Sequence, residues 1–519
     1  MNIDLSKSYV VGLIAFLWAL TLGLLLQLFV LPYIFPDLHD GNGLMNGNDW
    51  VWFNQLAVEL AHKINETGWD NWELRPHGQA PAGIAAAIYA LTGVSKPFVY
   101  MPLNAILFAV AVAEMHRFIS YVTKENKYAW VGLLPLLLFP SSLLIYGQLH
   151  KDIFSIAGIF LIFNTLLLTS NQKGWGAYLS FFLRTILGLF LIWVVRPYFM
   201  EVVSLAWAVG ASILVLWILW RRPIQYKQLL IMVIGLFFIH QWSVSYATSK
   251  YHLPVYSVNP NSINSNSINS KLEKQKARKA NSINPNSINP NSINPNSINP
   301  NSINPNSINL TSIKNVLFSL ESNHQYHLEI QKKQKALRGK FIEARMTKSI
   351  IPNSINSNFL ALGLHQLNNH YKGMKKLYPL RFDRIRRNFI TGYPHAASMI
   401  DENVRFYTIS DLIYYTPRAI QIGYLAPFPN MWTAQGFSPG SGLMRKTSGI
   451  EMLIAYVVFM AGFVGLIMQR KSEYFVIIMA ALLVGAVIVL VQSLAIPNIG
   501  TLYRMRLAPW HMTLGLSLY

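Results

Sequence analysis

The chain has 519 residues, of which 52% are hydrophobic and only 13% are charged, and its mean hydropathy is positive at +0.31. A soluble protein of this size would carry about 25% charged residues. The composition therefore excludes an ordinary soluble enzyme and indicates an all-α, polytopic membrane protein. There are no cysteines, which excludes disulfides and thiolate metal sites. No Walker loop, Gly-x-Ser-x-Gly, His-Glu-x-x-His or dinucleotide fingerprint occurs, so ATP-driven transport by this chain alone is not expected.

About nine to ten apolar segments of membrane-spanning length are expected. The predicted spans cover 10–34, 97–118, 129–147, 153–169, 177–195, 199–219, 228–243, 450–468 and 474–493. The first is too long for a signal-peptide core and lacks a small-residue cleavage site, so we expect a retained anchor. A tenth segment begins near Leu507, but only 13 residues remain to Tyr519, which leaves truncation at this end open.

The charges between the spans predict an orientation. With Lys7 in the cytoplasm, the basic short connections all fall on the cytoplasmic side, as the positive-inside rule requires: Arg117/Lys124/Lys127, Lys173, Arg221/Arg222/Lys227 and Arg470/Lys471. The opposite side collects acids, histidines and arginines: Asp37, Asp40, Asp49, His77, His150-Lys151-Asp152, Arg196, Asp401, Arg504 and Arg506. Any chemistry is therefore expected on the extracytoplasmic face.

Four regions are expected along the chain. An N-terminal transmembrane module (1–243, with a first extracytoplasmic loop at 35–96) precedes a basic low-complexity insertion (244–360), an ordered extracytoplasmic loop (361–449) and C-terminal spans (450–519). Within the insertion, Asn-Ser-Ile-Asn-Pro repeats five times from Asn281. Proline at every fifth residue blocks helix and central strand, and so few apolar residues cannot build a core. We expect disorder there and no catalytic role.

The net charge of +21 is mostly local, because 25 Lys and Arg oppose 8 Asp and Glu between residues 244 and 449. This basic stretch could attract lipid phosphates or acidic glycans, or could be a solvated loop. Nucleic acid is not an expected partner on that side of a membrane.

The first extracytoplasmic loop contains an amphipathic pattern. Apolar residues recur at helical spacing, at Trp50, Phe53, Leu56, Ala57, Leu60, Ala61 and Ile64. This predicts a helix lying along the membrane surface, followed by a short, half-embedded helix over Ala80 to Leu91. Asp49 precedes the first helix. Its carboxylate could deprotonate an acceptor hydroxyl or bind a phosphate-bearing metal, or it could be a plain N-cap.

A second candidate group lies between the third and fourth predicted spans. His150-Lys151-Asp152 places three adjacent polar residues at a membrane interface, where they are costly unless exposed or paired. Lys151 could hold a phosphate and Asp152 could supply a second carboxylate; the alternative is interfacial charge that sets helix depth.

The third group consists of arginines at span ends, Arg196, Arg504 and Arg506. Arginine binds phosphate in a bidentate way, although a span-end arginine can also reach lipid headgroups.

These features together resemble the GT-C superfamily of integral membrane glycosyltransferases, which includes protein mannosyltransferases and bacterial aminoarabinose transferases. Four stretches carry the resemblance: Asn48-Asp49-Trp50 leading into Phe53 to Ala61, Gly78 to Gly83, Leu149-His-Lys-Asp152, and Asn498 to Arg506, which is similar to an ending of bacterial polysaccharide-locus proteins. The chain departs from the family in lacking an Asp-Glu pair in the first loop, where Trp50 follows Asp49, and in having no clear soluble C-terminal domain.

The resemblance implies a polyprenyl-phosphate-linked sugar as donor, a glycan, lipid or protein acceptor, membrane lipids as partners and a bacterial cytoplasmic membrane. Asp49 would then be the catalytic base, Asp152 would orient the acceptor or a metal, and Lys151, Arg196, Arg504 and Arg506 would hold the lipid phosphate. A divalent metal ion is left open as a cofactor.

Two other classes remain as alternatives. A polysaccharide polymerase or ligase that acts on polyprenyl-diphosphate oligosaccharides would also have many spans, a large extracytoplasmic loop and phosphate-holding arginines. A membrane transporter is the other alternative, against which we note that the predicted spans carry almost no charge in their middles.

Overall fold

The computed structural model describes residues 7–46, 49–171, 175–221, 379–392, 398–434, 439–472 and 474–518. These ranges are mostly helical, with no β-strand and only two isolated bridges, His39 to Met45 and Met399 to Asn498, which confirms the predicted all-α fold for the described part of the chain. Contacts divide the chain into two units, residues 1–253 with 371–519 and residues 254–370, and every described residue belongs to the first. The predicted span 228–243 and the repeat insertion 244–360 lie outside the described residues.

The helices of the N-terminal half fall into two groups. Those with 13 or more residues are α1 (Ser8–Leu25), α2 (Asp49–Thr67), α3 (Ala80–Thr92), α4 (Met101–Thr123), α5 (Asn126–Leu138), α7 (Asp152–Asn171), α8 (Trp175–Val195) and α9 (Phe199–Arg221). The shorter ones are η1 (Leu26–Ile34), η2 (Pro36–Leu38), η3 (Trp69–Asn71), η4 (Pro76–Gly78), η5 (Pro97–Tyr100) and α6 (Pro140–Tyr146).

After the undescribed segment the chain resumes with a helix over 379–392. The remaining helices are α14 (Ile409–Leu425), α15 (Pro429–Trp432), α16 (Pro439–Met468), η13 (Gln469–Lys471), α17 (Phe475–Ala495), α18 (Ile499–Met505) and α19 (Leu507–Ser517). Helix α16 thus begins at Pro439, inside the segment predicted as loop.

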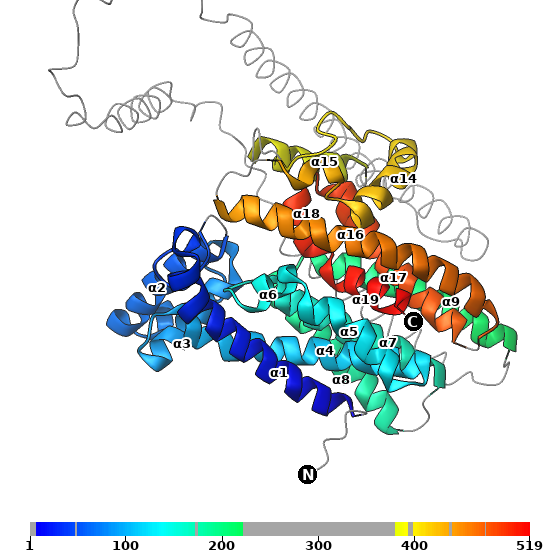
Figure 1. The fold of residues 1–519 in the computed structure, drawn as a ribbon, viewed down its shortest axis with the longest axis horizontal. Coiled ribbons are helices and arrows are strands. Elements are labelled where there is room, and N and C mark those ends of the chain that lie inside the picture. Colours follow the sequence, from blue (N-terminus) through cyan, green and yellow to red (C-terminus); the bar gives the residue numbers. More distant parts are fainter. Residues whose placement is uncertain are drawn as a thin grey trace, which may run out of the picture. The chain divides into compact units, whose positions relative to one another are not determined.

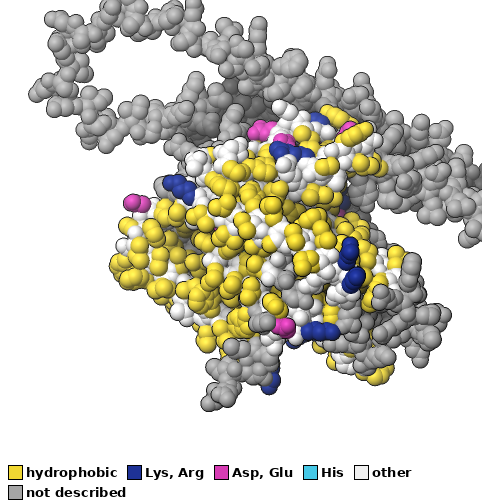
Figure 2. Space-filling view, turned by 45° about the vertical axis from the view of Figure 1, so that its right-hand side comes forward, with side chains coloured by type: hydrophobic (Ala, Val, Ile, Leu, Met, Phe, Trp, Pro, Cys, Tyr) yellow, Lys and Arg dark blue, Asp and Glu magenta, His cyan; other side chains and the backbone are white. Residues whose placement is uncertain are grey.

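Six described segments are long and apolar enough to cross a membrane: Ser8–Ile34, Pro97–Thr123, Trp175–Val195, Phe199–Trp217, Gly440–Lys471 and Phe475–Ala495. Each matches a predicted span, so a multi-pass helical membrane protein is the architecture that the described residues support. Their outward faces are apolar, as in α8 and α16, where Ile186, Phe190, Met460 and Phe463 are exposed. Figure 2 shows one such mainly hydrophobic face with few charged side chains on it.

Two predicted spans take a different form. The segment predicted at 129–147 is broken: its two helical pieces, Tyr128–Leu138 and Pro140–Tyr146, meet at 69°. Proline lacks the N–H needed to continue α5, so the break falls where Pro140 begins α6. The apolar helix predicted at 153–169 forms as α7 but is shorter than a full span in its apolar part.

The two helices predicted in the first loop form as α2 and α3. Helix α2 buries one face through Trp50, Phe53, Ala57, Ala61 and Ile64, and α3 packs against it. One polar position differs from the pattern: Asn54 is buried, and its Oδ1 accepts a hydrogen bond of 2.8 Å from the hydroxyl of Tyr89 on α3. A buried amide needs such a partner, which fixes α3 on α2.

The helices pack in pairs, with α1 on α4, α7 on α8 and α9 on α17 (Figure 1). At the crossing of α7 and α8, the two backbones approach each other closely at Gly158 and Gly188. A Cβ added at Gly158 would lie 2.6 Å from the carbonyl oxygen of Gly188, and one at Gly188 would lie 2.8 Å from that of Gly158. Only glycine permits this backbone approach, which is how small residues pack membrane helices closely.

Replacing Gly158 with Ala should therefore force α7 and α8 apart. Overpacking of this kind costs about 1–3 kcal/mol, and a lower thermal unfolding midpoint in detergent would measure it. The matched control is Gly465→Ala in α16, where an added Cβ meets nothing within 4 Å. That change should leave the midpoint unchanged or raise it, because alanine has the higher helix propensity. Equal loss in both variants would contradict the tight crossing.

Candidate functional site

Four helix ends converge on the predicted site residues. Asp49 and Asp152 are the first residues of α2 and α7, Arg196 directly follows α8, and Arg504 lies in the last turn of α18. The helix macrodipole places partial positive charge at the N-terminus and partial negative charge at the C-terminus. Each carboxylate and each guanidinium therefore stands at the helix end that favours it.

The side chains form one continuous chain of polar contacts. Asp49 Oδ2 lies 3.2 Å from Arg504 Nη1, and the same nitrogen lies 3.3 Å from His150 Nε2. The other ring nitrogen, Nδ1, lies 3.1 Å from Asp152 Oδ2, while Asp152 Oδ1 forms an ion pair with Arg196 Nη2. The structure thus brings together residues that are hundreds of positions apart in sequence.

This series of polar contacts runs from an accessible end at Asp49 to a buried end at Arg196. The side chain of Asp49 is 44% exposed and that of Arg504 is 21% exposed. His150, Asp152 and Arg196 are buried. A ligand would therefore meet Asp49 and Arg504 first. The buried His150 contacts Arg504 on the inner side of the site.

His150 belongs to the second candidate group of the sequence analysis, but no role was assigned to it there. Burial lowers the pKa of His150 from 6.5 to about 4, so the ring is neutral near pH 7. The backbone N–H of Asp152 donates to His150 Nδ1 at 3.0 Å, and Arg504 Nη1 lies 3.3 Å from Nε2, so neighbouring groups hold both ring nitrogens. The ring of Trp50, with its centre 5.7 Å away, packs beside the imidazole.

The charges of the two acids follow from their neighbours. Burial raises the pKa of Asp49, but the positive charges of Arg504 and Lys151 outweigh it, so the pKa lies below its ordinary 3.8. Burial likewise raises that of Asp152, and the positive charge of Arg196 brings the pKa below its usual value. Both carboxylates are ionised at neutral pH.

Lys151 lies beside the same series of polar contacts. Its Nζ donates to Gln79 Oε1 at 3.4 Å and stands 5.5 Å from the centre of the Phe53 ring. Burial, and then the positive charge of Arg196, lower the pKa of Lys151 from 10.5 to about 8. Its ammonium is therefore destabilised by its surroundings and would gain from a nearby anion.

The site carries an excess of one positive charge. Lys151, Arg196 and Arg504 face two carboxylates, Asp49 and Asp152. Arg196 is 3% exposed, yet its Nε and Nη1 have no hydrogen-bond partner among the described residues. A buried guanidinium with unpaired donors costs free energy until an acceptor reaches it. The arrangement can bind an anion with several oxygens, such as a phosphate.

Arg506, which was predicted to share in phosphate binding, lies elsewhere. It is fully buried and donates to the carbonyl oxygens of Ile422, Gly423 and Ala426 at the C-terminal end of α14. Its guanidinium also stacks over the rings of Tyr503 and Trp510. Arg506 therefore joins α14 to the α18–α19 junction, and we do not retain it in the anion site.

Other acids named from the sequence also have local roles. Asp40 Oδ1 accepts the backbone N–H groups of Asn42 and Leu44, as in a turn. Asp401 pairs with Arg418 at 3.0 Å and accepts the hydroxyl of Tyr415 at 2.7 Å. Among the described residues, neither side chain forms a hydrogen bond or ion pair with the polar contacts that run from Asp49 to Arg196.

The described spans contain few charged residues in their middles, and those that they contain have partners. Arg184, in the middle of α8, pairs with Glu114 of α4, with Nε 3.1 Å from Oε2. Glu451 of α16 is buried, and it accepts the backbone N–H of Ser141 at 2.8 Å and the hydroxyl of Tyr503. Each charge has a partner, which is what makes it tolerable inside a membrane.

A divalent metal ion would need several carboxylate or imidazole ligands around one point. Within the described ranges, no three His, Asp or Glu side chains are grouped in that way, and Asp49 is already paired with Arg504. We therefore assign no metal ligands.

Comparisons with protein-family models, with curated proteins and with solved structures give no significant match to this chain.

Proposed function

We propose that this protein is an integral membrane glycosyltransferase that moves a sugar from a polyprenyl-phosphate donor to an extracytoplasmic glycan, lipid or protein in envelope polysaccharide biosynthesis. The observation that carries the proposal is the excess positive charge at Lys151, Arg196 and Arg504, with two unpaired donors on Arg196. A phosphate would supply both the missing charge and the missing acceptors. The half-exposed carboxylate of Asp49 stands beside it as a base.

The membrane supplies the reason for a lipid donor. The positive-inside pattern of the sequence predicts that these helix ends lie on the extracytoplasmic side. A polyprenyl tail also needs apolar surface, and a groove of about 190 Å³ lies between α1, α4 and α5. All of its lining side chains are apolar or aromatic: Val11, Ile14, Ala15, Trp18, Val112, Trp130, Leu137 and Leu138. The hydrocarbon would lie there or among the bilayer lipids.

The reaction would proceed as a displacement at the anomeric carbon. Asp49 takes the proton of the acceptor hydroxyl, and the acceptor oxygen forms a bond to the anomeric carbon. The bond from that carbon to the phosphate oxygen breaks, and its electron pair leaves with the polyprenyl phosphate. The cations Lys151, Arg196 and Arg504 stabilise the charge that develops there, which is where most of the rate enhancement would arise.

The ion pair between Asp49 and Arg504 implies an order of steps, in which the donor binds first. While Arg504 holds Asp49 at 3.2 Å, the carboxylate is a weak base because its pKa is lowered. A bound phosphate would compete for Arg504, which His150 still holds from behind. Asp49 would then become more basic. The donor would therefore bind before the acceptor is activated.

Phosphate binding should weaken at alkaline pH because of Lys151. The protonated amine binds the anion, and the pKa of Lys151 in the protein without a bound anion is about 8. Affinity should thus be constant below that pH and fall as pH rises through 8, while Lys151→Arg should remove the fall because arginine stays protonated. The measurement is binding of a short prenyl phosphodiester of glucose, whose own charge does not change in this range. An unchanged fall in Lys151→Arg would contradict the assignment.

The function itself is tested by mass spectrometry of lipid extracts from cells with the wild-type protein and from cells with a deletion. Build-up of a polyprenyl-phosphate monosaccharide in the deletion supports the glycosyltransferase. Build-up of a polyprenyl-diphosphate oligosaccharide would instead identify the polymerase or ligase alternative, which would use the same cationic site.

The pair of Glu114 and Arg184 within the spans favours a membrane transporter as the second candidate, since transporters keep ionisable groups at that depth. If the deletion changes neither lipid, while Glu114→Gln alters the passage of a solute across the membrane, the transporter becomes the better assignment.

A further inference from the structure

Helix α14 has an apolar exposed face, although the sequence predicts an extracytoplasmic loop there. Ile413, Pro417 and Ile420 follow one another at spacings of four and three residues, so they form one stripe along the helix. All three are exposed, Ile413 by 65% and Ile420 by 41%. A single apolar side chain at a surface is ordinary, but an exposed apolar stripe marks a surface that contacts a partner or a membrane.

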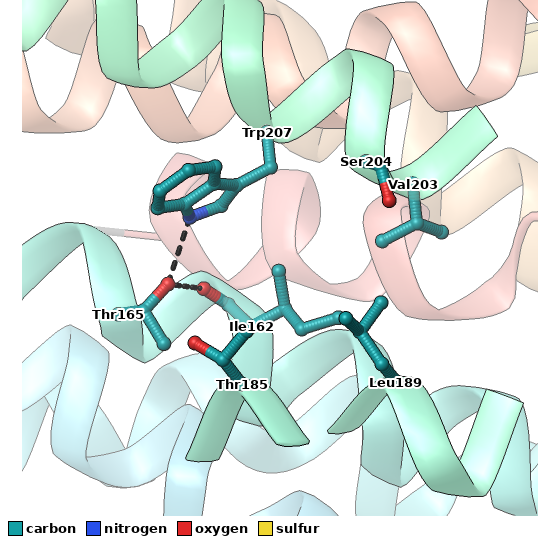
Figure 3. A pocket seen from close by; sticks show the side chains of 7 residues that line it. All are labelled: Ile162, Thr165, Thr185, Leu189, Val203, Ser204 and Trp207. Carbon is teal, nitrogen blue, oxygen red and sulfur yellow. Dashed lines mark hydrogen bonds between the residues drawn. The ribbon is translucent and has the colours of Figure 1, made fainter. Parts of the chain in front are cut away.

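The membrane-spanning helices distribute their side chains in the same way. In α9, Trp207 is turned into the bundle, where its Nε1 donates to Thr165 Oγ1 of α7 at 2.7 Å (Figure 3). Leu205 and Leu216 of the same helix are 50% and 66% exposed. In α14, Arg418 is likewise turned away from the apolar stripe and pairs with Asp401. Helix α14 therefore has the side-chain distribution of a helix in contact with lipid.

The apolar stripe continues onto α16, which is long and apolar enough to span the membrane. Tyr424 lies one turn beyond Ile420, and its ring packs against that of Phe459 of α16, with the ring centres 5.9 Å apart. The next residue of α16, Met460, is 75% exposed. The exposed surface of α14 is thus continuous with the surface that α16 presents to the acyl chains.

Helix α14 lies against the end of a second span. It packs on α17, where a Cβ added at Gly423 would clash with the side chains of Val489 and Ser493. Ala419 of α14 shares a buried cluster with Leu494. All three α17 residues belong to its last two turns, because the helix ends at Ala495. The end of a span lies at the surface of the bilayer.

A polar edge runs beside the apolar stripe. It consists of Ser410, Tyr414 and Gln421, which are all exposed. At 3.6 residues per turn, these residues stand about 60–100° around the helix from Ile413. An apolar face with a polar edge is the pattern of a helix that lies in the membrane interface. Tyrosine suits that level, because its ring is apolar and its hydroxyl is polar.

We propose that α14 lies in the surface of the bilayer, with its apolar stripe among the acyl chains and its polar edge at the level of the lipid headgroups. The segment predicted as a loop over the membrane domain is then anchored in the membrane itself. Arg506 connects the C-terminal end of α14 to α18, which carries Arg504, so this anchor also supports the anion site from outside. The inference does not depend on the proposed reaction.

Site-directed spin labelling tests this position, since the chain has no cysteine of its own. A nitroxide is attached in turn to Ile413→Cys, Ile420→Cys and Gln421→Cys, and each protein is placed in vesicles of phosphatidylcholine and phosphatidylglycerol. Power saturation then compares collisions with oxygen, which concentrates in lipid, and with a water-soluble nickel chelate. Met460→Cys in α16 is the lipid reference, and Glu402→Cys, exposed before α14, is the water reference.

Labels at Ile413 and Ile420 should match the oxygen-to-nickel ratio of the label at Met460, several-fold above that at Glu402. The label at Gln421 should fall clearly below that at its neighbour Ile420. A ratio at Ile413 and Ile420 as low as that at Glu402 would place α14 in water and overturn the proposal. Labels shielded from both reagents would show that protein covers the stripe, either another part of this chain or a second copy, and would overturn it as well.

Discussion

Replacing Asp49 with Asn should abolish sugar transfer while the protein still folds in the membrane. The amide keeps the size of the side chain but cannot accept a proton from an acceptor hydroxyl. General-base catalysis is typically worth about 10²–10⁴-fold in rate, so a loss of that size is expected. The fold should survive because Asp49 is half exposed and its ion pair with Arg504 is not buried.

The measurement is the same lipid extract, with the Asn variant expressed in the deletion strain at wild-type level. A polyprenyl-phosphate monosaccharide should accumulate as it does in the deletion. Asp37→Asn is the matched control, because Asp37 belongs to the same loop, is exposed in η2 and has no contact with the chain from Asp49 to Arg196. Full transfer by the Asp49 variant would remove Asp49 as the base, whatever the reaction is.

Measuring the binding of the prenyl phosphodiester distinguishes the loss of a catalytic base from damage to the phosphate site. Asp49→Asn frees Arg504 from its partner, so the prenyl phosphodiester should bind at least as tightly as to the wild type. A variant that neither binds nor transfers would indicate a damaged site rather than a missing base.

The spans could be predicted from the sequence because they depend on local composition. A run of apolar residues about 20 long has few alternatives to a membrane helix. The break between α5 and α6 was harder to predict from the sequence. Pro140 indicates a possible break, but the 69° bend depends on how α6 packs on α1, α4 and α16. The start of α16 was predicted too late in the sequence. Its first residues, from Pro439 to Lys446, are largely polar and were therefore assigned to the loop.

The site was predicted as a set of residue types and not as a geometry. Carboxylates and arginines at span ends were visible, but Asp49 and Arg504 are 455 residues apart, and no local pattern pairs them. No role was predicted for His150 because its role depends on burial between Arg504 and Asp152.

Arg506 could have been excluded by helix geometry. Residues two apart in a helix point about 200° away from each other, so Arg504 and Arg506 could not both face one phosphate from a helical α18. The structure confirms this divergence, with Arg506 turned to the carbonyl groups of α14.

Asp152→Asn should destabilise the protein strongly, because it removes one partner of a buried ion pair. The side chains of Arg196 and Asp152 are 4% and 2% exposed, and an asparagine would leave the guanidinium charge uncompensated. Breaking a buried pair from one side costs about 3–5 kcal/mol. Thermal unfolding in detergent measures the loss. Glu201→Gln is the matched control: Glu201 also lies in the first turn of a helix and pairs with an arginine, Arg381, but these side chains are 28% and 56% exposed. Its loss should stay within about 1 kcal/mol.

The double variant Asp152→Asn, Arg196→Gln distinguishes stability from function. Removing both charges leaves no uncompensated ion, so much of the lost stability should return. Transfer and phosphodiester binding should not return, because the proposed phosphate site has lost Arg196. If the double variant is as unstable as the single one, the two residues do not act as a pair. If it regains both stability and full binding, Arg196 serves only to support Asp152, and the anion site reduces to Lys151 and Arg504.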